Sequence, residues 1–330
     1  MKLSILDQSI VRKGGTPAEA IMETIETAKL AEQLGYSRFW VSEHHNSTMI
    51  AGSTPELLMV RLAGETDKIR IGSGGIMLPN HSALKVAENF RMLETMYPGR
   101  IDLGMGRAPG SDQITAALLN PSNTFSEESY LIQLEHLQAF FTDKAETKYG
   151  PILAVPQSST MPQQWILSSS GGSASIAARF GMGLAIARFI NGFATPELVE
   201  SYRKTFIPSE QFPEPKELIA ITVLCADTKE KAEQMRKVSN FTLLQFERGV
   251  FEPIVSFDEI KDYQFNAQEL QRIHLNEGRM ISGDLQQVKK QLEQLAHEFD
   301  VDEIVVSTMT HSKKDRFRSF ELVAEAFALR

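Results

Sequence analysis

The 330-residue sequence predicts a single α/β domain over residues 1–330, folded as a closed (β/α)8 TIM barrel. Eight short runs of apolar and β-branched residues alternate with helical segments, which is the pattern of parallel strands joined by helices. No sharp change in composition divides the chain, and its 42% hydrophobic residues suffice for one large core. Because such a barrel typically needs ~250 residues, the surplus predicts insertions after strand 4 and between strands 7 and 8.

Each expected element is bounded by turn or capping signals. Thr16-Pro17 and Thr54-Pro55 place a capping residue before a proline, which is typical of helix starts. Tyr97-Pro98-Gly99 ends a helix that begins near residue 83, and Ser282-Gly283-Asp284 predicts the start of an amphipathic helix that runs to residue 297. A doubly wound open sheet is the alternative to the barrel. The expected strands cover residues 2–7, 38–42, 69–78, 100–105, 165–169, 183–187, 218–225 and 303–308.

Charge and cysteine content exclude several classes of partner. The net charge is -8 and the chain has no long basic run, so we expect it to bind neither nucleic acid nor an anionic membrane. Its apolar runs are strand-sized, far below the ~20 residues of a membrane span. The single cysteine, Cys225, excludes an internal disulfide and favours a reducing, cytoplasmic location.

Titratable side chains gather where the second strand ends, in residues 39–46. In a parallel barrel the carboxyl ends of the strands carry the active site. His44 is therefore a candidate general acid or base, and a structural, hydrogen-bonded histidine is the alternative. His44 and His45 are adjacent and point to opposite faces of a strand, and no H-E-x-x-H pattern is present, so we predict no metal site. We expect Glu43 to be buried and paired, with His81 as its partner or as a plain loop residue.

A run of small and hydroxyl-bearing residues joins the fifth strand to its helix and predicts an anion site. Amides and hydroxyls of such a loop can donate to a phosphate, and the helix dipole favours negative charge. Arg107, just past the fourth strand, adds a forked donor suited to phosphate. The alternative for the loop is an ordinary N-cap. The alternative for Arg107 is a surface ion pair. The predicted phosphate-binding residues are Arg107, Ser169, Ser170, Gly171, Gly172 and Ser173.

Glycines occupy two further strand ends. Gly74 and Gly75 indicate either a bulge or the close approach of a flat ring to the backbone. The segment 104–110 is rich in glycine, but Pro109 intrudes and no helix is expected there, so it is not a dinucleotide fingerprint. Its glycines instead favour room for a flat ligand over strand four.

Taken together, these segments resemble the bacterial luciferase-like flavin monooxygenase family over nearly the whole chain. The resemblance implies a TIM barrel that binds reduced FMN, or in some branches F420, at its C-terminal mouth. It implies that Arg107 and Ser169–Ser173 hold the flavin phosphate and that Gly74-Gly75, often a non-prolyl cis peptide, lies against the isoalloxazine. His44 matches the active-site histidine. The segments that carry the resemblance are residues 39–46, 71–81, 97–110, 169–173, 282–284 and 301–304.

The resemblance also implies a reaction. A separate reductase would supply reduced FMN, and the protein would use it with O2 to oxygenate a small organic substrate, with residues 108–125 and 251–279 as lids. Light-emitting members carry a reactive cysteine where this chain has Gly106, so light emission is not expected. The alternatives are F420-dependent hydride transfer and a non-catalytic flavin-binding protein. By analogy with the family, we expect a homodimer formed through helices near strands two and three.

Overall fold

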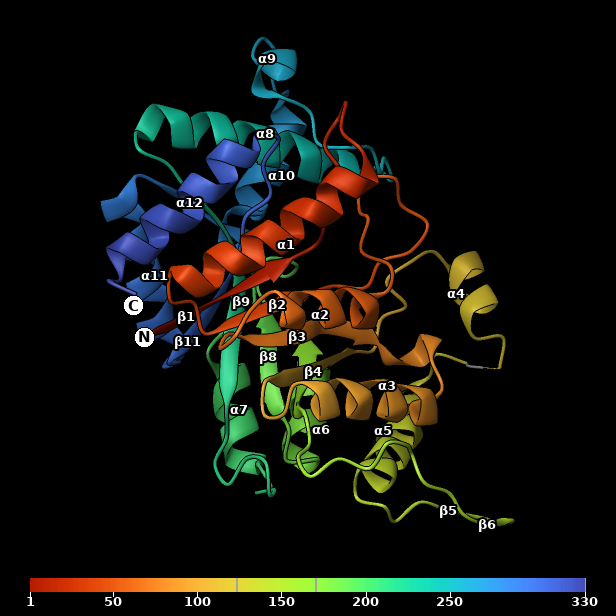
Figure 1. The fold of residues 1–330 in the computed structure, drawn as a ribbon. Helices are drawn as coiled ribbons and strands as arrows, with labels where there is room; N and C mark the ends of the chain where they lie inside the picture. The colour runs from red at the N-terminus through yellow and green to blue at the C-terminus, as the bar shows by residue number, and fades with distance from the viewer. Residues whose placement is uncertain (123, 170, 330) are drawn as a thin grey trace.

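The computed structural model describes residues 1–122, 124–169 and 171–329. Within these residues, eight parallel strands form a closed ring, since β8 pairs with β9, β9 with β11 and β11 with β1 (Figure 1). The predicted TIM barrel is confirmed, and closure excludes the open sheet. The ring strands are β1 (Lys2–Asp7), β2 (Arg38–Val41), β3 (Arg70–Met77), β4 (Ile101–Gly106), β7 (Gln163–Ser168), β8 (Gly183–Ala187), β9 (Glu217–Cys225) and β11 (Glu303–Ser307).

Helices surround the ring and bury one face against it (Figure 1). The expected capping signal at Thr16 is present, since its side chain accepts from the backbone of Glu19 while the Glu19 carboxylate accepts from Thr16. The helices that follow the strands are α1 (Pro17–Gln33), α2 (Pro55–Gly64), α3 (Ala83–Met96), α5 (Glu127–Phe141), α6 (Gly172–Arg179), α7 (Glu197–Thr205), α8 (Lys229–Glu247) and α12 (Lys313–Ala326).

The two insertions lie where the chain length predicted them. The first, between β4 and β7, adds α4 (Gln113–Leu119) and a small hairpin of β5 (Glu146–Thr147) and β6 (Gly150–Pro151), which project from the barrel in Figure 1. The second, between β9 and β11, adds elements after α8. They are α9 (Phe257–Ile260), α10 (Ala267–Leu275), η2 (Glu277–Arg279), β10 (Met280–Gly283) and α11 (Leu285–Phe299).

One expected boundary is wrong. We read Ser282-Gly283-Asp284 as the start of a helix, but Ser282 and Gly283 belong to β10, which pairs with the end of β9. Asp284 alone caps α11, with its carboxylate accepting from the Gln287 amide at 2.9 Å. Among the described helices, none is both long enough and apolar enough to cross a membrane.

Two indole rings fill the middle of the barrel. Trp40 of β2 and Trp165 of β7 meet edge to face with ring centroids 5.7 Å apart. Glycines on neighbouring strands make this possible: a Cβ on Gly72 would lie 2.6 Å from the Trp40 ring, and one on Gly183 would overlap Trp165. The indoles thus form a packed floor across the barrel.

Charged groups close the barrel below this floor. The guanidinium of Arg38 donates to Asp102 and to Glu303, each at 2.8 Å, and Arg70 donates to the other oxygen of Asp102. Asp102 also accepts from the indole of Trp40 at 2.9 Å. Burial disfavours the charge of Asp102, but Arg38 and Arg70 outweigh it and lower the pKa of that carboxyl. The N-terminal end of the barrel is therefore occupied by paired side chains.

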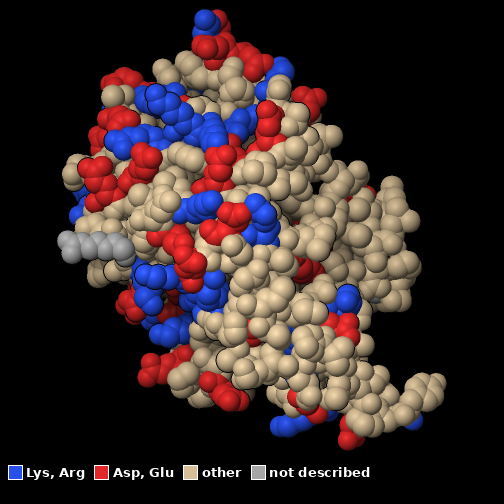
Figure 2. Space-filling model, in the orientation of Figure 1, with Lys and Arg blue, Asp and Glu red and all other residues tan. Residues whose placement is uncertain are grey.

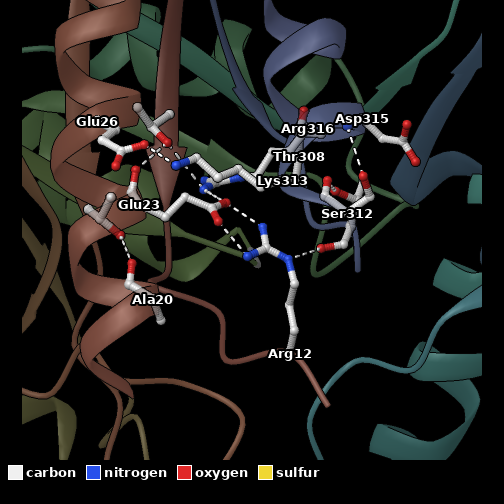
Figure 3. Close-up of polar contacts among 12 residues, drawn as sticks. Arg12, Ala20, Glu23, Glu26, Thr308, Ser312, Lys313, Asp315 and Arg316 are labelled. Carbon is white, nitrogen blue, oxygen red and sulfur yellow. Dashed lines mark hydrogen bonds and ion pairs between the residues drawn. The ribbon is translucent and has the colours of Figure 1, made fainter. Parts of the chain in front are cut away.

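A second buried ionic network joins the first and last barrel units (Figure 3). Arg316 of α12 donates to Asp7 of β1 at 2.6 Å and to Glu23 of α1 at 3.0 Å. Arg12, in the loop after β1, pairs with the same Glu23 and donates to the carbonyl of Thr310 at 3.1 Å. These ion pairs therefore connect β1 and α1 to α12, where the first and last units of the barrel meet.

Candidate active site at the C-terminal mouth

Above the indole floor lies a cavity of about 390 Å³ that opens at the carboxyl ends of the strands. It exists because the residues that face inward at this level are small, notably Gly74, Gly106, Ala185, Ala187 and Ala220. Trp40 lies at its base, and Leu218 and Val305 line the lower part of the wall formed by β9 and β11. The further lining residues are Leu6, Gln8, Ser42, Glu43, His44, Met77, Arg107, Ala108, Pro109, Gly110, Phe125, Leu167, Ser168, Ser169, Ser173, Phe189 and Ile190.

His44 faces this cavity, as the sequence predicts. Its backbone amide donates to the Gly52 carbonyl at 2.9 Å, which fixes the turn after β2. Its Nδ1 is buried and, among the described residues, has no hydrogen-bond partner. Burial lowers the pKa of His44, the charge of Glu43 opposes this shift, and His45 adds to it. The imidazole is therefore held neutral near pH 7.

Glu43 is buried and paired, as expected, and His81 is its partner. One Glu43 oxygen lies 2.8 Å from Nε2 of His45, and both lie 3.0 Å from Nε2 of His81. The carboxylate also accepts from Asn80 at 3.0 Å and from the Met77 amide at 2.8 Å. Burial opposes its charge, but the hydrogen bonds from His45 and His81 lower the pKa of Glu43 to about 2. Glu43 is thus a fixed anion that ties the end of β2 to the end of β3.

The predicted phosphate residues divide into two groups. Arg107, Ser169 and Ser173 line the cavity, and Ser173 lies in the first turn of α6. Gly171 and Gly172, at the start of the helix just before Ser173, are not among the described lining residues. Among the described residues, nothing lies within 4 Å of a Cβ built on either glycine. Ser170 lies outside the described residues. The first amides of a helix have no partners within it and attract anions.

Arg107 also forms the ion pair that we considered as the alternative. Its guanidinium lies 2.5 Å from the carboxylate of Glu127, in the first turn of α5. About a third of the Arg107 side chain is exposed, and Glu127 is more exposed still. A surface pair of this kind contributes little, so a dianionic phosphate can compete with Glu127 for the guanidinium.

The Gly74-Gly75 peptide is cis, in agreement with what the family resemblance implies. Gly74 faces the cavity, but Gly75 is not among the described residues that line it. A Cβ on Gly75 would lie 2.5 Å from Leu167 and 2.7 Å from the Gly104 carbonyl. Gly75 is therefore required for packing against β4.

Sequence reasoning missed several lining residues. Gln8 and Ser42 follow strand ends and could have been found by that rule, whereas Phe189 and the inward-facing alanines resemble ordinary core residues. Of the two predicted lids, residues 108–110 and 125 line the cavity, while no described residue of 251–279 does. That second segment packs against α8 instead. Among the described residues, no cluster of three or more His, Cys, Asp or Glu side chains could hold a metal.

The fold is a TIM barrel with a ligand-sized cavity at its C-terminal face, which is where barrel enzymes carry their active sites. Comparison with known proteins identifies the family. The model of the luciferase-like monooxygenases matches residues 1–316, so the chain belongs to this family.

Several relatives match over nearly their whole length. The YwcH protein of Bacillus subtilis is 45% identical over 99% of both chains. The N-acetyl-S-alkylcysteine monooxygenase of B. subtilis is 34% identical, over 99% of this chain and 98% of its own. The crystal structure of apo-MsnO8 is 35% identical, superposes with a TM-score of 0.92, and covers 100% of this chain and 99% of its own.

Proposed function

We propose that the protein is an FMN-dependent monooxygenase that takes reduced FMN from a separate reductase and oxygenates a small organic substrate. The observation that carries the proposal is the single cavity that Arg107, the start of α6, Gly74 and His44 share. Family membership supports oxygenase chemistry, and the arrangement of these groups supports a flavin with one phosphate.

The residues present suit FMN. Arg107, Ser169 and Ser173 with the α6 amides would hold the phosphate. The isoalloxazine would lie beside Gly74, which lines the cavity. The buried, unpartnered Nδ1 of His44 would then find its missing partner on the ring or the substrate.

When bound, reduced FMN supplies two electrons to O2, so that one oxygen atom enters the substrate and the other leaves as water. His44, held neutral by burial, would move a proton through Nδ1 during this reaction. Trp40 and Leu218 below, with Phe125 at the mouth, would exclude water from the reacting atoms.

Two features support a separate reductase and a homodimer. Gly104 and Gly106 lie within β4, and the next described helix, α4, begins only at Gln113, so this segment does not have the strand–glycine–helix form of a dinucleotide site. On the outer surface of α2 and α3, Leu57 and Met92 are 73% and 49% exposed, with Val60 and Met96 beside them. A second copy of the chain would cover these apolar side chains.

Titration of the purified protein with reduced FMN and with reduced F420 tests the cofactor. We expect FMN to bind more tightly, and Arg107→Met to weaken FMN about 10- to 100-fold because a charge-assisted bond to phosphate is lost. Arg179→Met is the matched control, since Arg179 is an exposed arginine paired with Glu135. Equal titration curves for Arg107→Met and the unmutated protein would refute the phosphate role, and tighter F420 binding would favour hydride transfer.

The oxygenation itself is tested with His44→Ala. We expect turnover to fall by about 10²- to 10⁴-fold while FMN affinity stays within about threefold, since His44 acts on protons and not on the phosphate. Turnover is measured as ¹⁸O from ¹⁸O2 in the product, using methyl alkyl sulfides as substrates, because one relative is named for an S-alkyl substrate. Consumption of reduced FMN without labelled product would identify a flavin-binding protein.

A further inference from the structure

The two walls of the cavity differ in polarity. The wall formed by β1 to β4 and the start of α6 presents polar groups, among them Gln8, Ser42, His44, Arg107 and Ser173. The opposite wall is formed by β8, β9, β11 and the loop after β8. Every described lining residue on it is apolar, namely Ala185, Ala187, Phe189, Ile190, Leu218, Ala220 and Val305.

We infer that this apolar wall is the substrate subsite and that it selects a neutral substrate whose buried group is a short, compact alkyl chain. The inference rests on the proposed function, because FMN bound at Arg107 and Gly74 would occupy the polar wall. Arg107 is the one lysine or arginine among the described lining residues, and it is assigned to the phosphate. A substrate carboxylate on the apolar wall would be desolvated without a partner.

The size of the cavity limits the substrate. Pockets for drug-sized ligands measure ~300–1,000 Å³, and this cavity of about 390 Å³ would have to hold a tricyclic ring as well. The free space beside Ala185, Ala187 and Ala220 exists only because these side chains end at Cβ. Larger residues at these positions would fill it.

Backbone hydrogen bonds and core packing also fix the position of the apolar wall. The amide of Phe189 donates to the Ala220 carbonyl at 3.1 Å, and the Phe189 carbonyl accepts from the guanidinium of Arg279 at 2.8 Å. Leu218 and Val305 are buried within the barrel core. The subsite is therefore preformed, which favours selection by shape.

A series of methyl n-alkyl sulfides, titrated into the FMN-loaded protein and followed by the absorbance of bound FMN, measures the subsite without turnover. We expect affinity to rise about fourfold per added methylene and to level off once the wall is filled. A sulfide of the same length ending in a carboxylate should bind at least tenfold more weakly. Equal binding of the charged and neutral probes would overturn the inference with no mutation required.

The variant Ala187→Leu tests whether the sulfides bind at the apolar wall. We expect this variant to level off at shorter chains and to bind the longest sulfide at least tenfold more weakly, with FMN affinity within about twofold. Ala267→Leu, at an exposed alanine that opens α10, is the matched control and should leave all affinities unchanged. An identical chain-length profile in Ala187→Leu and the unmutated protein would place the substrate elsewhere.

A failure of the proposed function can be distinguished from a failure of the subsite. If the protein does not bind FMN, the same sulfides can be titrated calorimetrically into the FMN-free protein. A chain-length dependence that Ala187→Leu shortens would then still support an apolar subsite, whereas no binding of any sulfide would contradict it.

Discussion

At the scale of single residues, the carboxylate of Glu43 organises the polar side of the mouth. It is almost completely buried. It is hydrogen-bonded to His45, which follows β2, and accepts from the amide of Met77 at the end of β3. Asn80 and His81, which follow β3, also bond to it. Its charge lies next to His44 in sequence and partly offsets the effect of burial on that imidazole. Glu43 therefore positions the site, and we expect it to act on the reaction only through its neighbours.

His81→Gln tests this pair through its pH dependence. Burial lowers the pKa of His81, but the hydrogen bond and charge of Glu43 outweigh burial and raise it. Because the pKa of His81 is higher in the folded protein than in the unfolded chain, protonated His81 stabilises the fold fully below about pH 6.5. This stabilisation is lost as the pH rises through the pKa of His81 in the folded protein. Glu43, with a pKa of about 2, contributes above about pH 4.5. We expect the variant to lose roughly 1–2 kcal/mol near pH 5.5 and less at pH 8.5, by urea unfolding.

His136→Gln is the control for this comparison. His136 lies on α5, exposed, and has no role in the mouth, so the free energy of unfolding should match that of the unmutated protein at both pH values. A loss in His81→Gln that is the same at pH 5.5 and pH 8.5 would mean that His81 contributes by packing and not by its charge.

At the scale of elements, α2 and α3 lie side by side on the outside of the barrel and carry the exposed apolar side chains assigned to the dimer (Figure 1). On the face shown in Figure 2, acidic and basic residues are interspersed, and no single basic patch dominates. The double variant Leu57→Glu/Met92→Glu should convert a dimer to a monomer in sedimentation velocity, since it buries two like charges at the interface.

Leu270→Glu is the matched control for this surface. Leu270 is similarly exposed, at 54%, but lies on α10, away from α2 and α3. This variant should sediment like the unmutated protein. A monomeric unmutated protein, or a double variant that stays dimeric, would exclude the α2–α3 surface.

The elements that the sequence predicts well are those with strong local signals. The strands before residue 110 alternate with capped helices, and their positions agree with the structure within a few residues. β10 was missed because its four residues are stabilised by pairing with β9, which no local pattern reports. The hairpin of β5 and β6 was missed for a similar reason, since each of its strands has two residues.

At the scale of the whole molecule, the position of the mouth could be predicted from the sequence, but the depth of the cavity could not. Because ligands bind at the carboxyl ends of barrel strands, the sequence predicts that His44, Arg107 and Ser173 lie near one another, and all three line the cavity. The depth of the cavity depends instead on the sizes of residues that meet across the ring. Trp40 fills the space over Gly72, and the short side chain of Ala220 leaves space open; the sequence gives no indication of which strands face each other in this way.

A buried ionic network lies at the seam between the first and last barrel units, where β1 pairs with β11. Arg316 is paired with Asp7 and Glu23, and all three side chains are less than a tenth exposed. Burial disfavours the charge of Arg316, but the two carboxylates outweigh burial and raise its pKa. Replacing Arg316 by methionine keeps the apolar stem and leaves two buried carboxylates with one guanidinium, that of Arg12, beside Glu23.

We therefore expect Arg316→Met to destabilise the protein by about 3–5 kcal/mol, because an uncompensated buried charge is costly. The measurement is the shift of the urea unfolding midpoint by circular dichroism at pH 7. Arg318→Met on the same helix is the matched control; its partners Asp227 and Glu321 are exposed, so the loss should stay below about 1 kcal/mol. Equal shifts for the two variants would mean that the seam is held by apolar packing between α1 and α12 and that its ion pairs add nothing to closure.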